Sequence, residues 1–282
     1  MKGPVRAAEP EPRGGTDSRL PEREAHIGPE KTMDTNPFYA GLAPFYHLIY
    51  PDWEGSMRHQ AEMLDATIRD TWGDVSCVLD VSCGIGTQAL GLARLGYSVT
   101  ASDLSPEEVD RATCEAAERG LSIRFSVADM RQAHDHHAAQ FDVVMACDNA
   151  VPHLLSDEDI LSAFRQFHAC TRPGGGCIVT VRDYEKEDLS SQRIKPYGIR
   201  EENGVRWLLW QVWDPHLPTY DFTFYLVEDR GERECRTHAL RCTYYAVTIP
   251  RLMELLGQAG FADVRRLDGK FFQPMIVGTR RA

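Results

Sequence analysis

The sequence predicts an α/β fold: a doubly wound, mainly parallel sheet with an antiparallel meander inserted after its fifth strand. Two observations carry this prediction. Between Cys77 and Asp183, short apolar runs of strand length alternate with amphipathic segments of helix length, and such alternation favours right-handed crossovers and a parallel sheet. After Asp183 the rhythm changes to aromatic and β-branched runs separated by turn residues, which is typical of antiparallel strands.

The elements follow in order along the chain. An amphipathic helix is expected first, over 54–72, because Met57, Ala61, Leu64 and Ile68 fall on one helical face. Strands are then expected at 77–82, 97–103, 122–129, 141–148 and 174–183, with helices at 87–96, 105–120 and 156–171 between them. Ser105 before Pro106 is typical of a helix start, and Ser156 with Asp159 resembles a capping box. The meander should occupy 205–214, 219–229 and 235–247, before a helix at 248–261 and a terminal strand pair at 262–281.

The composition of the chain disfavours several classes of function. The 282 residues carry a formal net charge of −11, which disfavours a nucleic-acid partner because an acidic surface repels phosphates. No uninterrupted apolar run is long enough to predict a membrane span. The eight cysteines form no CxxC pair, as expected for reduced thiols in a cytoplasmic protein, and no histidine–carboxylate cluster has metal-site spacing.

Three regions are expected along the chain. Residues 1–36 are rich in Pro, Glu, Arg and Gly, so they are predicted to be a disordered tail. Residues 37–282 should form the domain, with 183–247 as an antiparallel insertion on the substrate side.

The stretch "VLDVSCGIGTQALGLARLGYSVTASDLS" indicates a ligand. Gly84 and Gly86 end the first predicted strand, where glycine allows a tight turn and close approach of a ligand. Asp103 ends the second strand, where a carboxylate can accept both ribose hydroxyls of an adenosine. A GxGxxG turn alone is also compatible with a dinucleotide. Asp80, directly before the turn, suits an ammonium group better than a pyrophosphate, and this favours S-adenosyl-L-methionine as the cofactor.

The ordered segments "VLDVSCGIGT", "VTASDLS", "VAD", "FDVVMACDN" and "RPGGGCIVTV" resemble the motifs of class I S-adenosylmethionine-dependent methyltransferases. The segments "DNAVPHL", "VRDYEKED", "LRCTYYAV" and "LDGKFFQP" are closest to the glycine/sarcosine N-methyltransferase group. The resemblance implies a Rossmann-like methyltransferase fold and N-methylation of a small amine or amino acid. It is compatible with a homo-oligomer. The chain departs from the group at Asp221-Phe222-Thr223, where a pocket tyrosine and its hydroxyl are missing, and in its N-terminal tail.

The resemblance also implies roles for individual residues. The substrate side would have Asn149 at the amine, Arg182 at the carboxylate, and Tyr184 and Tyr244 as pocket walls. No general base is evident, and His153 is the one nearby candidate. The cofactor side would comprise Tyr39, Tyr46, Arg58, Asp80, Val81, Ser82, Gly84, Asp103, Leu104, Asp129, Met130, Cys147 and His153.

Three alternatives remain open from the sequence. The first is an O- or N-methyltransferase of a secondary metabolite or amino sugar. The second is a nucleotide-dependent oxidoreductase, which is disfavoured because the chain lacks a dehydrogenase catalytic set. The third is a protein that binds the cofactor without catalysis, against which the intact "DVSCGIG" and Asp103 argue.

Overall fold

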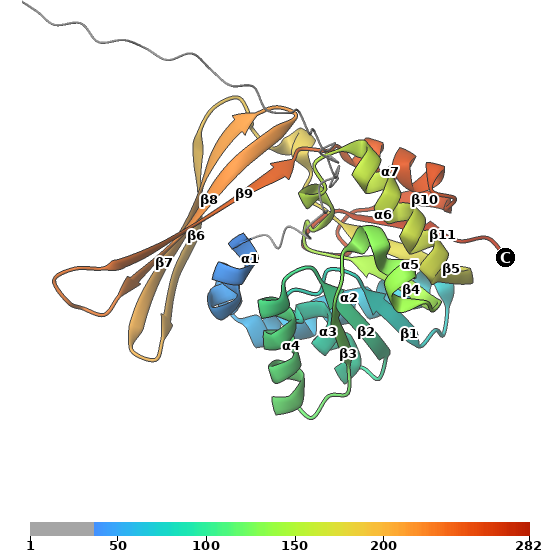
Figure 1. The fold of residues 1–282 in the computed structure, drawn as a ribbon, viewed down its shortest axis with the longest axis horizontal. Coiled ribbons are helices and arrows are strands. Elements are labelled where there is room, and N and C mark those ends of the chain that lie inside the picture. The colour runs from blue at the N-terminus through green and yellow to red at the C-terminus, as the bar shows by residue number, and fades with distance from the viewer. Residues whose placement is uncertain (1–36) are drawn as a thin grey trace, which may run out of the picture. The chain divides into compact units, whose positions relative to one another are not determined.

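The structure, a computed structural model, describes residues 37–282 (Figure 1). The predicted tail, residues 1–36, lies outside the described residues. Within 37–282 the predicted α/β architecture is confirmed, with one seven-stranded sheet and a separate four-stranded antiparallel sheet that follows the fifth strand.

The seven-stranded sheet has the order β10-β11-β5-β4-β1-β2-β3, in which β1 to β5 run parallel and β11 pairs antiparallel with both β5 and β10. The chain passes from β1 to β2 on one side and later returns to β4 on the other. Ligands bind at such a reversal, outside the carboxyl ends of the strands. The strands are β1 Cys77–Asp80, β2 Ser98–Asp103, β3 Arg124–Val127, β4 Phe141–Ala146, β5 Thr171–Thr180, β10 Ala262–Leu267 and β11 Met275–Thr279.

Helices connect these strands and begin where the sequence signals predict. Ser105 accepts a hydrogen bond from the Glu108 N–H at the start of α4, and Ser156 accepts one from the Asp159 N–H at the start of α6. The α-helices are α1 Pro37–Leu42, α2 Trp53–Trp72, α3 Thr87–Arg94, α4 Pro106–Glu118, α5 Ala133–His137, α6 Asp157–Cys170 and α7 Ile249–Gln258. The 3₁₀ helices are η1 Ala43–Ile49, η2 Met130–Gln132, η3 Val151–His153 and η4 Tyr184–Lys186.

The long helix α2 packs directly on the backbone of β5. A Cβ atom added to Gly176 would lie 2.0 Å from the Trp72 indole, so only glycine leaves room for this ring. The indole Nε1 donates a hydrogen bond of 3.0 Å to Thr279 Oγ1 on β11. Gly176 within β5 therefore serves helix packing.

The antiparallel sheet comprises β6 Arg193–Glu202, β7 Val205–His216, β8 Thr219–Asp229 and β9 Arg236–Tyr245, in that order. Three of these strands were predicted, and β6 was not. Its side chains are largely exposed, and the pairing register shifts between Pro196 and Gly198, so it lacks an apolar alternation. The inner face is aromatic, and its fully buried side chains Trp213, Tyr220, Phe222 and Phe224 share one core cluster with the parallel sheet.

The segment 37–50 lies between the two sheets. Figure 1 shows α1 beside the antiparallel sheet and near α4, and α1 contacts β9, η1 and α4. Arg200 of β6 fixes the end of this segment. Its guanidinium donates to the carbonyls of Tyr50 at 3.0 Å, Ile49 at 3.1 Å and Tyr197 at 3.1 Å. The side chains of 37–50 are thereby held over the carboxyl ends of the parallel strands.

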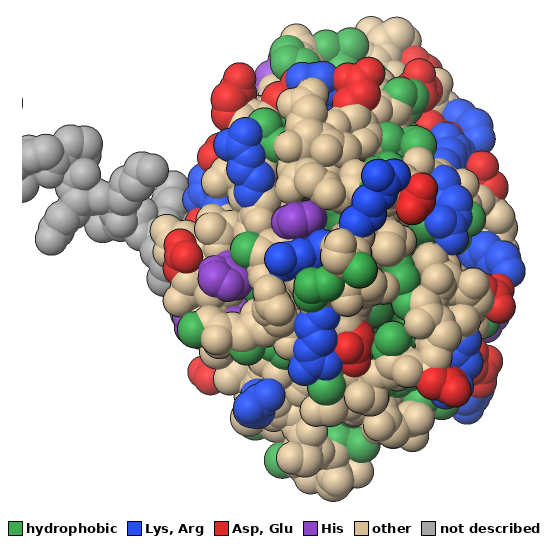
Figure 2. All heavy atoms as spheres, turned by 90° about the vertical axis from the view of Figure 1, so that its right-hand side faces the viewer, with side chains coloured by type: hydrophobic (Ala, Val, Ile, Leu, Met, Phe, Trp, Pro, Cys, Tyr) green, Lys and Arg blue, Asp and Glu red, His purple; other side chains and the backbone are tan. Residues whose placement is uncertain are grey.

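Figure 2 shows the face on the side of β10 and β11, where acidic and basic side chains are interspersed. Among residues 37–282, no helix combines the length and the apolar character needed to cross a membrane.

Candidate active site

The turn after β1 is built on glycine and held by Asp103. Gly84 has φ +52° and Gly86 has φ +94°, in the left-handed region that favours glycine. The Gly84 N–H donates to Asp103 Oδ2 at 2.9 Å. A Cβ atom on Gly84 would lie 3.2 Å from the Tyr46 ring, so Tyr46 covers the turn at close range.

Several buried polar atoms at this turn have no partner among the described residues. Asp80 is fully buried, and its Oδ1 accepts from the Ser82 N–H at 3.2 Å, while its Oδ2 has no hydrogen bond. Ser82 Oγ is also unpartnered. Burial, followed by the charge of Asp103, raises the pKa of the Asp80 carboxyl to about 7. An orphaned buried carboxylate oxygen beside an orphaned hydroxyl fits a ligand that brings a cation and hydrogen-bonding groups.

Both carboxylate oxygens of Asp103, unlike those of Asp80, accept hydrogen bonds from the backbone. Its Oδ1 accepts from the Ser105 N–H at 3.0 Å, and burial still raises the pKa of this carboxyl. A carboxylate has about four acceptor sites, so room remains for hydroxyl donors. The half-buried Leu104 follows it, and the buried Val81 donates its N–H to the Met145 carbonyl at 3.0 Å.

The predicted residues after β3 and β4 lie at the same edge of the sheet. The Asp129 carboxylate is already paired with Arg131, at 2.6 Å, and half-buried Met130 follows it. Cys147 is buried after β4, and burial raises the pKa of its thiol well above the usual value.

Tyr39 and His153 form a contact beneath the antiparallel sheet. The Tyr39 hydroxyl is hydrogen-bonded to His153 Nε2, and His153 Nδ1 lies 3.5 Å from Cys242 Sγ. The His153 ring centroid lies 4.3 Å from that of Tyr244. Burial lowers the pKa of His153 to about 3, so the imidazole is neutral at ordinary pH. Both ring nitrogens are engaged, which leaves His153 poorly prepared to take a proton.

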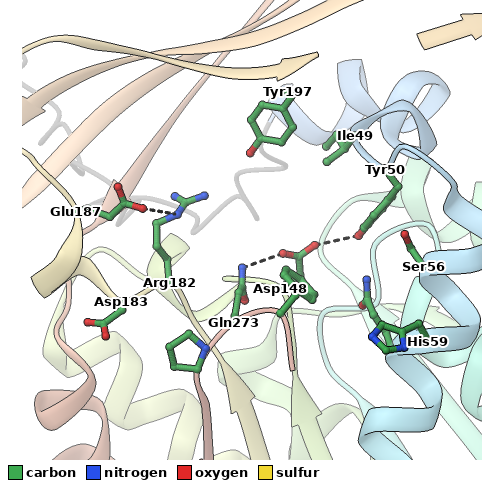
Figure 3. A pocket seen from close by; sticks show the side chains of 13 residues that line it. Ile49, Tyr50, Ser56, His59, Asp148, Arg182, Asp183, Glu187, Tyr197 and Gln273 are labelled. Atoms are coloured by element: carbon green, nitrogen blue, oxygen red, sulfur yellow. Dashed lines mark hydrogen bonds and ion pairs between the residues drawn. The ribbon is translucent and has the colours of Figure 1, made fainter. Parts of the chain in front are cut away.

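Beside these groups lies a cavity of about 520 Å³, shown in Figure 3. Its walls come from η1, the start of α2, the ends of β4 and β5, β6 and the segment before β11. The predicted Arg58 is exposed on α2 and is not a lining residue. The cavity is lined by Ile49, Tyr50, Ser56, His59, Gln60, Asp148, Arg182, Asp183, Glu187, Tyr197, Phe272, Gln273 and Pro274.

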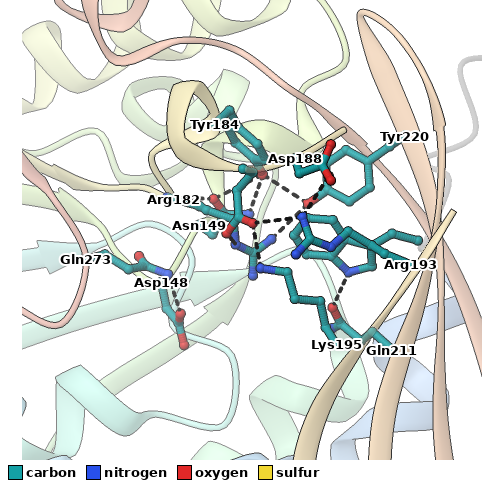
Figure 4. A network of polar contacts seen from close by, with 12 residues as sticks. Asp148, Asn149, Arg182, Tyr184, Asp188, Arg193, Lys195, Gln211, Tyr220 and Gln273 are labelled. Carbon is teal, nitrogen blue, oxygen red and sulfur yellow. Dashed lines mark hydrogen bonds and ion pairs between the residues drawn. The ribbon is translucent and has the colours of Figure 1, made fainter. Parts of the chain in front are cut away.

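Arg182 lies on the cavity wall within a network of mainly neutral partners (Figure 4). Its Nη1 donates to the Tyr220 hydroxyl at 2.8 Å, and the guanidinium carbon lies 4.7 Å from the centre of the Trp213 ring. The nearest acid is Glu187, whose Oε1 lies 3.8 Å from Arg182 Nε. Glu187 is itself paired with Lys195 at 2.5 Å. The guanidinium is therefore oriented mainly by neutral groups, with one longer ion-pair contact to Glu187.

Asp148 also lines the cavity, and sequence reasoning did not single it out. Its carboxylate accepts from the Tyr50 hydroxyl at 3.0 Å and from Gln273 Nε2 at 3.1 Å, which are both neutral donors. Burial raises the pKa of Asp148 above its usual value. Its φ of +55° and that of Asn149, +65°, are uncommon for residues with a side chain. Asp and Asn tolerate this conformation better than most residues, so the pair Asp148-Asn149 directly after a predicted strand was the sequence signal for a functional turn here.

Asn149, Tyr184 and Tyr244 lie behind this wall and are not cavity-lining residues. The buried Asn149 accepts from the Arg182 N–H at 3.0 Å, and its Nδ2 donates to the Tyr184 hydroxyl at 2.9 Å. The Tyr244 ring stacks on Phe222, with centroids 4.9 Å apart. The pocket tyrosines on the wall are Tyr50 and Tyr197.

The expected loss of a hydroxyl at Asp221-Phe222-Thr223 is offset by Tyr220. Tyr220 and Phe222 are two residues apart on β8, so they share its inner face. The Tyr220 hydroxyl reaches Arg182 and lies 3.3 Å from the Tyr184 hydroxyl. Position 222 does lack a hydroxyl, as the sequence indicates, and Tyr220 places one beside the arginine from the same strand.

Comparisons with known proteins identify the class of domain to which part of this chain is similar. Residues 78–175 match the family model of a methyltransferase domain. The chain is 31% identical to a glycine/sarcosine N-methyltransferase of Parasynechococcus marenigrum (strain WH8102), over 39% of each chain. It is 34% identical to a ubiquinone biosynthesis O-methyltransferase of Shewanella pealeana, over 45% of this chain and 55% of that one. The aligned segments thus span about half or less of these relatives.

Among solved structures, the fold is similar to that of CalS10, an amino pentose methyltransferase from Micromonospora echinaspora. The TM-score is 0.69 at 18% identity, and the match covers 80% of this chain and 92% of CalS10, which was solved with S-adenosylmethionine bound. The turn at Gly84, the unpartnered oxygen of Asp80 and the matched segment point to one class of enzyme. Residues 78–175 therefore carry a methyltransferase domain.

Proposed function

We propose that this enzyme methylates the nitrogen of a small acceptor that carries both an amine and a carboxylate, such as an amino acid. One observation carries the proposal: Arg182 lines the cavity and is oriented by the neutral Tyr220 hydroxyl and the Trp213 ring. A planar guanidinium held in this way suits a carboxylate, which it can bind through two parallel hydrogen bonds.

Asp148 supplies the complementary charge. It lines the same cavity as Arg182, and in Figure 3 both side chains border the open space. The hydrogen-bond partners of Asp148, Tyr50 and Gln273, are neutral, and the cation whose charge acts on Asp148 is Arg182. A zwitterionic acceptor would compensate Arg182 and Asp148 together. We assign the acceptor ammonium to Asp148 and the carboxylate to Arg182.

Asn149 and Tyr184 act, in this proposal, as positioning residues. Asn149 and Tyr184 are hydrogen-bonded to each other, and Asn149 accepts from the Arg182 N–H, so together they fix the position of the Arg182 backbone. This differs from the roles expected from the resemblance, in which Asn149 and Tyr184 meet the acceptor directly.

The cofactor would be held by the turn after β1 and by Asp103. Asp80 and Ser82 present unpartnered oxygens, and the Gly84 backbone allows close approach. When bound, S-adenosylmethionine supplies an electrophilic methyl group on its sulfonium. The protein's own contribution is to align the amine with that methyl and to exclude water, in which Tyr46 over Gly84 takes part.

The acceptor nitrogen must lose a proton before it can attack. His153 is buried with both ring nitrogens engaged, and its pKa is lowered to about 3, so it is a poor base. Asp148 has a raised pKa because of burial, and it borders the space where the ammonium would bind. We assign to Asp148 the first acceptance of this proton.

An amino sugar is the second candidate acceptor, because the cavity of about 520 Å³ has room for more than a small amino acid and has aromatic residues in its walls. The fold similarity to CalS10, named as an amino pentose methyltransferase, is consistent with this alternative. An amino sugar would use Asp148 and would not need Arg182.

The test is an acceptor panel. Purified enzyme and S-adenosylmethionine are incubated with glycine, sarcosine, larger amino acids, amino sugars and phenols, and the product mass is searched for one added CH₂. Turnover of amino acids that is lost in Arg182→Ala supports the proposal. Turnover of amino sugars that survives in Arg182→Ala would establish the second candidate instead.

A further inference from the structure

A third buried acid stands at the cofactor turn, and none of the roles above uses it. Glu108 lies in the first turn of α4 and is 1% exposed. Its Oε1 has no hydrogen-bond partner among residues 37–282. A Cβ atom on Gly84 would lie 3.5 Å from Glu108 Oε2, so this carboxyl borders the same turn as Asp103 and Tyr46.

The usual explanation for this glutamate does not hold. In a capping box, the glutamate three residues after Ser105 would accept a hydrogen bond from the Ser105 N–H. Here the Ser105 N–H donates to Asp103 Oδ1 instead. Ser105 Oγ accepts from the Glu108 N–H, so the backbone half of the motif is kept while the carboxyl group is released toward the turn.

The charges around this turn do not balance. Asp80, Asp103 and Glu108 are all buried or half-buried, and no ion pair among residues 37–282 involves any of them. The charge of Glu108 is coupled to groups that are acids or are neutral when protonated: Asp103, Glu107, Cys83, Tyr39 and Tyr46. Such a site favours a ligand with net positive charge.

S-adenosylmethionine has that charge, and its product does not. The sulfonium and ammonium carry two positive charges against one carboxylate, whereas S-adenosylhomocysteine has lost the sulfonium charge. We propose that Glu108 is a specificity-determining residue that, in its ionised form, favours the positively charged cofactor over the neutral product. The proposal rests on the cofactor position assigned above and is independent of the acceptor.

Proton balance follows from this assignment. Burial and the charge of Asp103 raise the pKa of Glu108 well above its usual value, so the empty site favours the protonated carboxyl. Binding of a sulfonium favours the carboxylate, and the proton leaves to solvent. S-adenosylhomocysteine offers no sulfonium and leaves Glu108 protonated, so product binding should release fewer protons.

The experiment is calorimetric titration of the full chain, without acceptor, with S-adenosylmethionine and with S-adenosylhomocysteine, in buffers of different ionisation enthalpy. In Glu108→Gln we expect about tenfold weaker binding of S-adenosylmethionine and less than about threefold for S-adenosylhomocysteine. The excess proton release on S-adenosylmethionine binding should disappear. Glutamine preserves size and capping capacity, and melting temperature checks the fold.

Glu118→Gln is the matched control, because Glu118 is exposed near the far end of the same helix. It should leave both affinities and the proton release unchanged. Equal weakening of both ligands by Glu108→Gln would overturn the proposal and indicate a contact to a group that both share, such as a ribose hydroxyl. Unchanged affinities and unchanged proton release would overturn it as well.

Discussion

The two halves of the site differ in how their polar groups are satisfied. At the turn after β1, buried oxygens of Asp80, Ser82 and Glu108 have no partner within residues 37–282. On the acceptor side, Asn149, Tyr184 and Tyr220 are hydrogen-bonded to one another. The first half therefore needs its ligand to complete it. In the second half the groups around Arg182 are hydrogen-bonded in advance, and among residues 37–282 Asp183 Oδ1 is a buried oxygen of the cavity lining without a hydrogen bond.

This difference predicts different responses to mutation. Removing a group from the cofactor half should weaken binding, because the ligand supplies the missing partners. Removing one from the acceptor half should lower the rate, because the network holds the geometry of the reacting groups.

The largest effect is expected for Arg182→Ala. Loss of one partner of a desolvated charge pair costs about 2–5 kcal/mol, so kcat/KM for an amino-acid acceptor should fall between about 30-fold and a few thousand-fold. Affinity for S-adenosylhomocysteine should stay within about twofold. Arg182→Lys should be impaired too, since a point charge lacks the planar fork. An unchanged rate would remove the carboxylate assignment, and a collapse of cofactor affinity would remove the division into two halves.

Asp103→Ala tests the cofactor half. The carboxylate holds the Gly84 N–H and, by assignment, the ribose hydroxyls. A hydrogen bond to a charged group contributes about 1.5–3 kcal/mol, so S-adenosylhomocysteine should bind about ten- to a hundredfold more weakly in calorimetry. Asp103 is assigned to the ribose, which S-adenosylmethionine and S-adenosylhomocysteine share. The loss should therefore be similar for S-adenosylmethionine, in contrast to Glu108→Gln.

The buried His153 should make the stability of the folded protein depend on pH. Burial lowers its pKa from the usual 6.5 to about 3. Between these two values the imidazole is protonated in the unfolded chain and neutral in the folded chain. Stability should therefore fall as pH drops from about 6.5 toward 3, by about 1.4 kcal/mol per pH unit from this group. Urea unfolding of wild type and His153→Asn at pH 7.5 and 5.0 measures it. Equal pH slopes in both proteins would contradict the assignment.

The smallest effect is expected for Tyr220→Phe. The change removes the hydroxyl that accepts from Arg182 Nη1 and leaves the ring in place. A single neutral partner contributes about 0.5–1.5 kcal/mol, so kcat should fall a few-fold to about tenfold. Thr243→Val, on the neighbouring strand and away from the arginine, serves as the control. If both variants behave alike, the Tyr220 hydroxyl does not orient Arg182.

The cofactor half was readable from sequence because its parts are local. The strand, the glycine turn and Asp103 follow one another within "VLDVSCGIGTQALGLARLGYSVTASDLS", and each has a backbone reason for its place. Glu108 was missed because the pattern Ser105-x-x-Glu108 already has a capping explanation. Only the structure shows that Asp103 takes the Ser105 N–H.

The acceptor half could be predicted only in part. Arg182 ends a recognisable strand, but its partners come from β8 and from the network around Asn149, and no periodicity places Tyr220 beside it. The strand β6 lacks an apolar alternation, so Tyr197 could not be assigned to the cavity. Asp148 is located by its two neutral donors, Tyr50 and Gln273, which are far from it in sequence.

The Arg200 guanidinium connects two walls of the cavity through hydrogen bonds. Because it holds the carbonyls of Ile49, Tyr50 and Tyr197 together, the walls formed by η1 and β6 behave as one stiff body. Phe272, which also lines the cavity, is 55% exposed and lies in the segment before β11, outside this bonded unit.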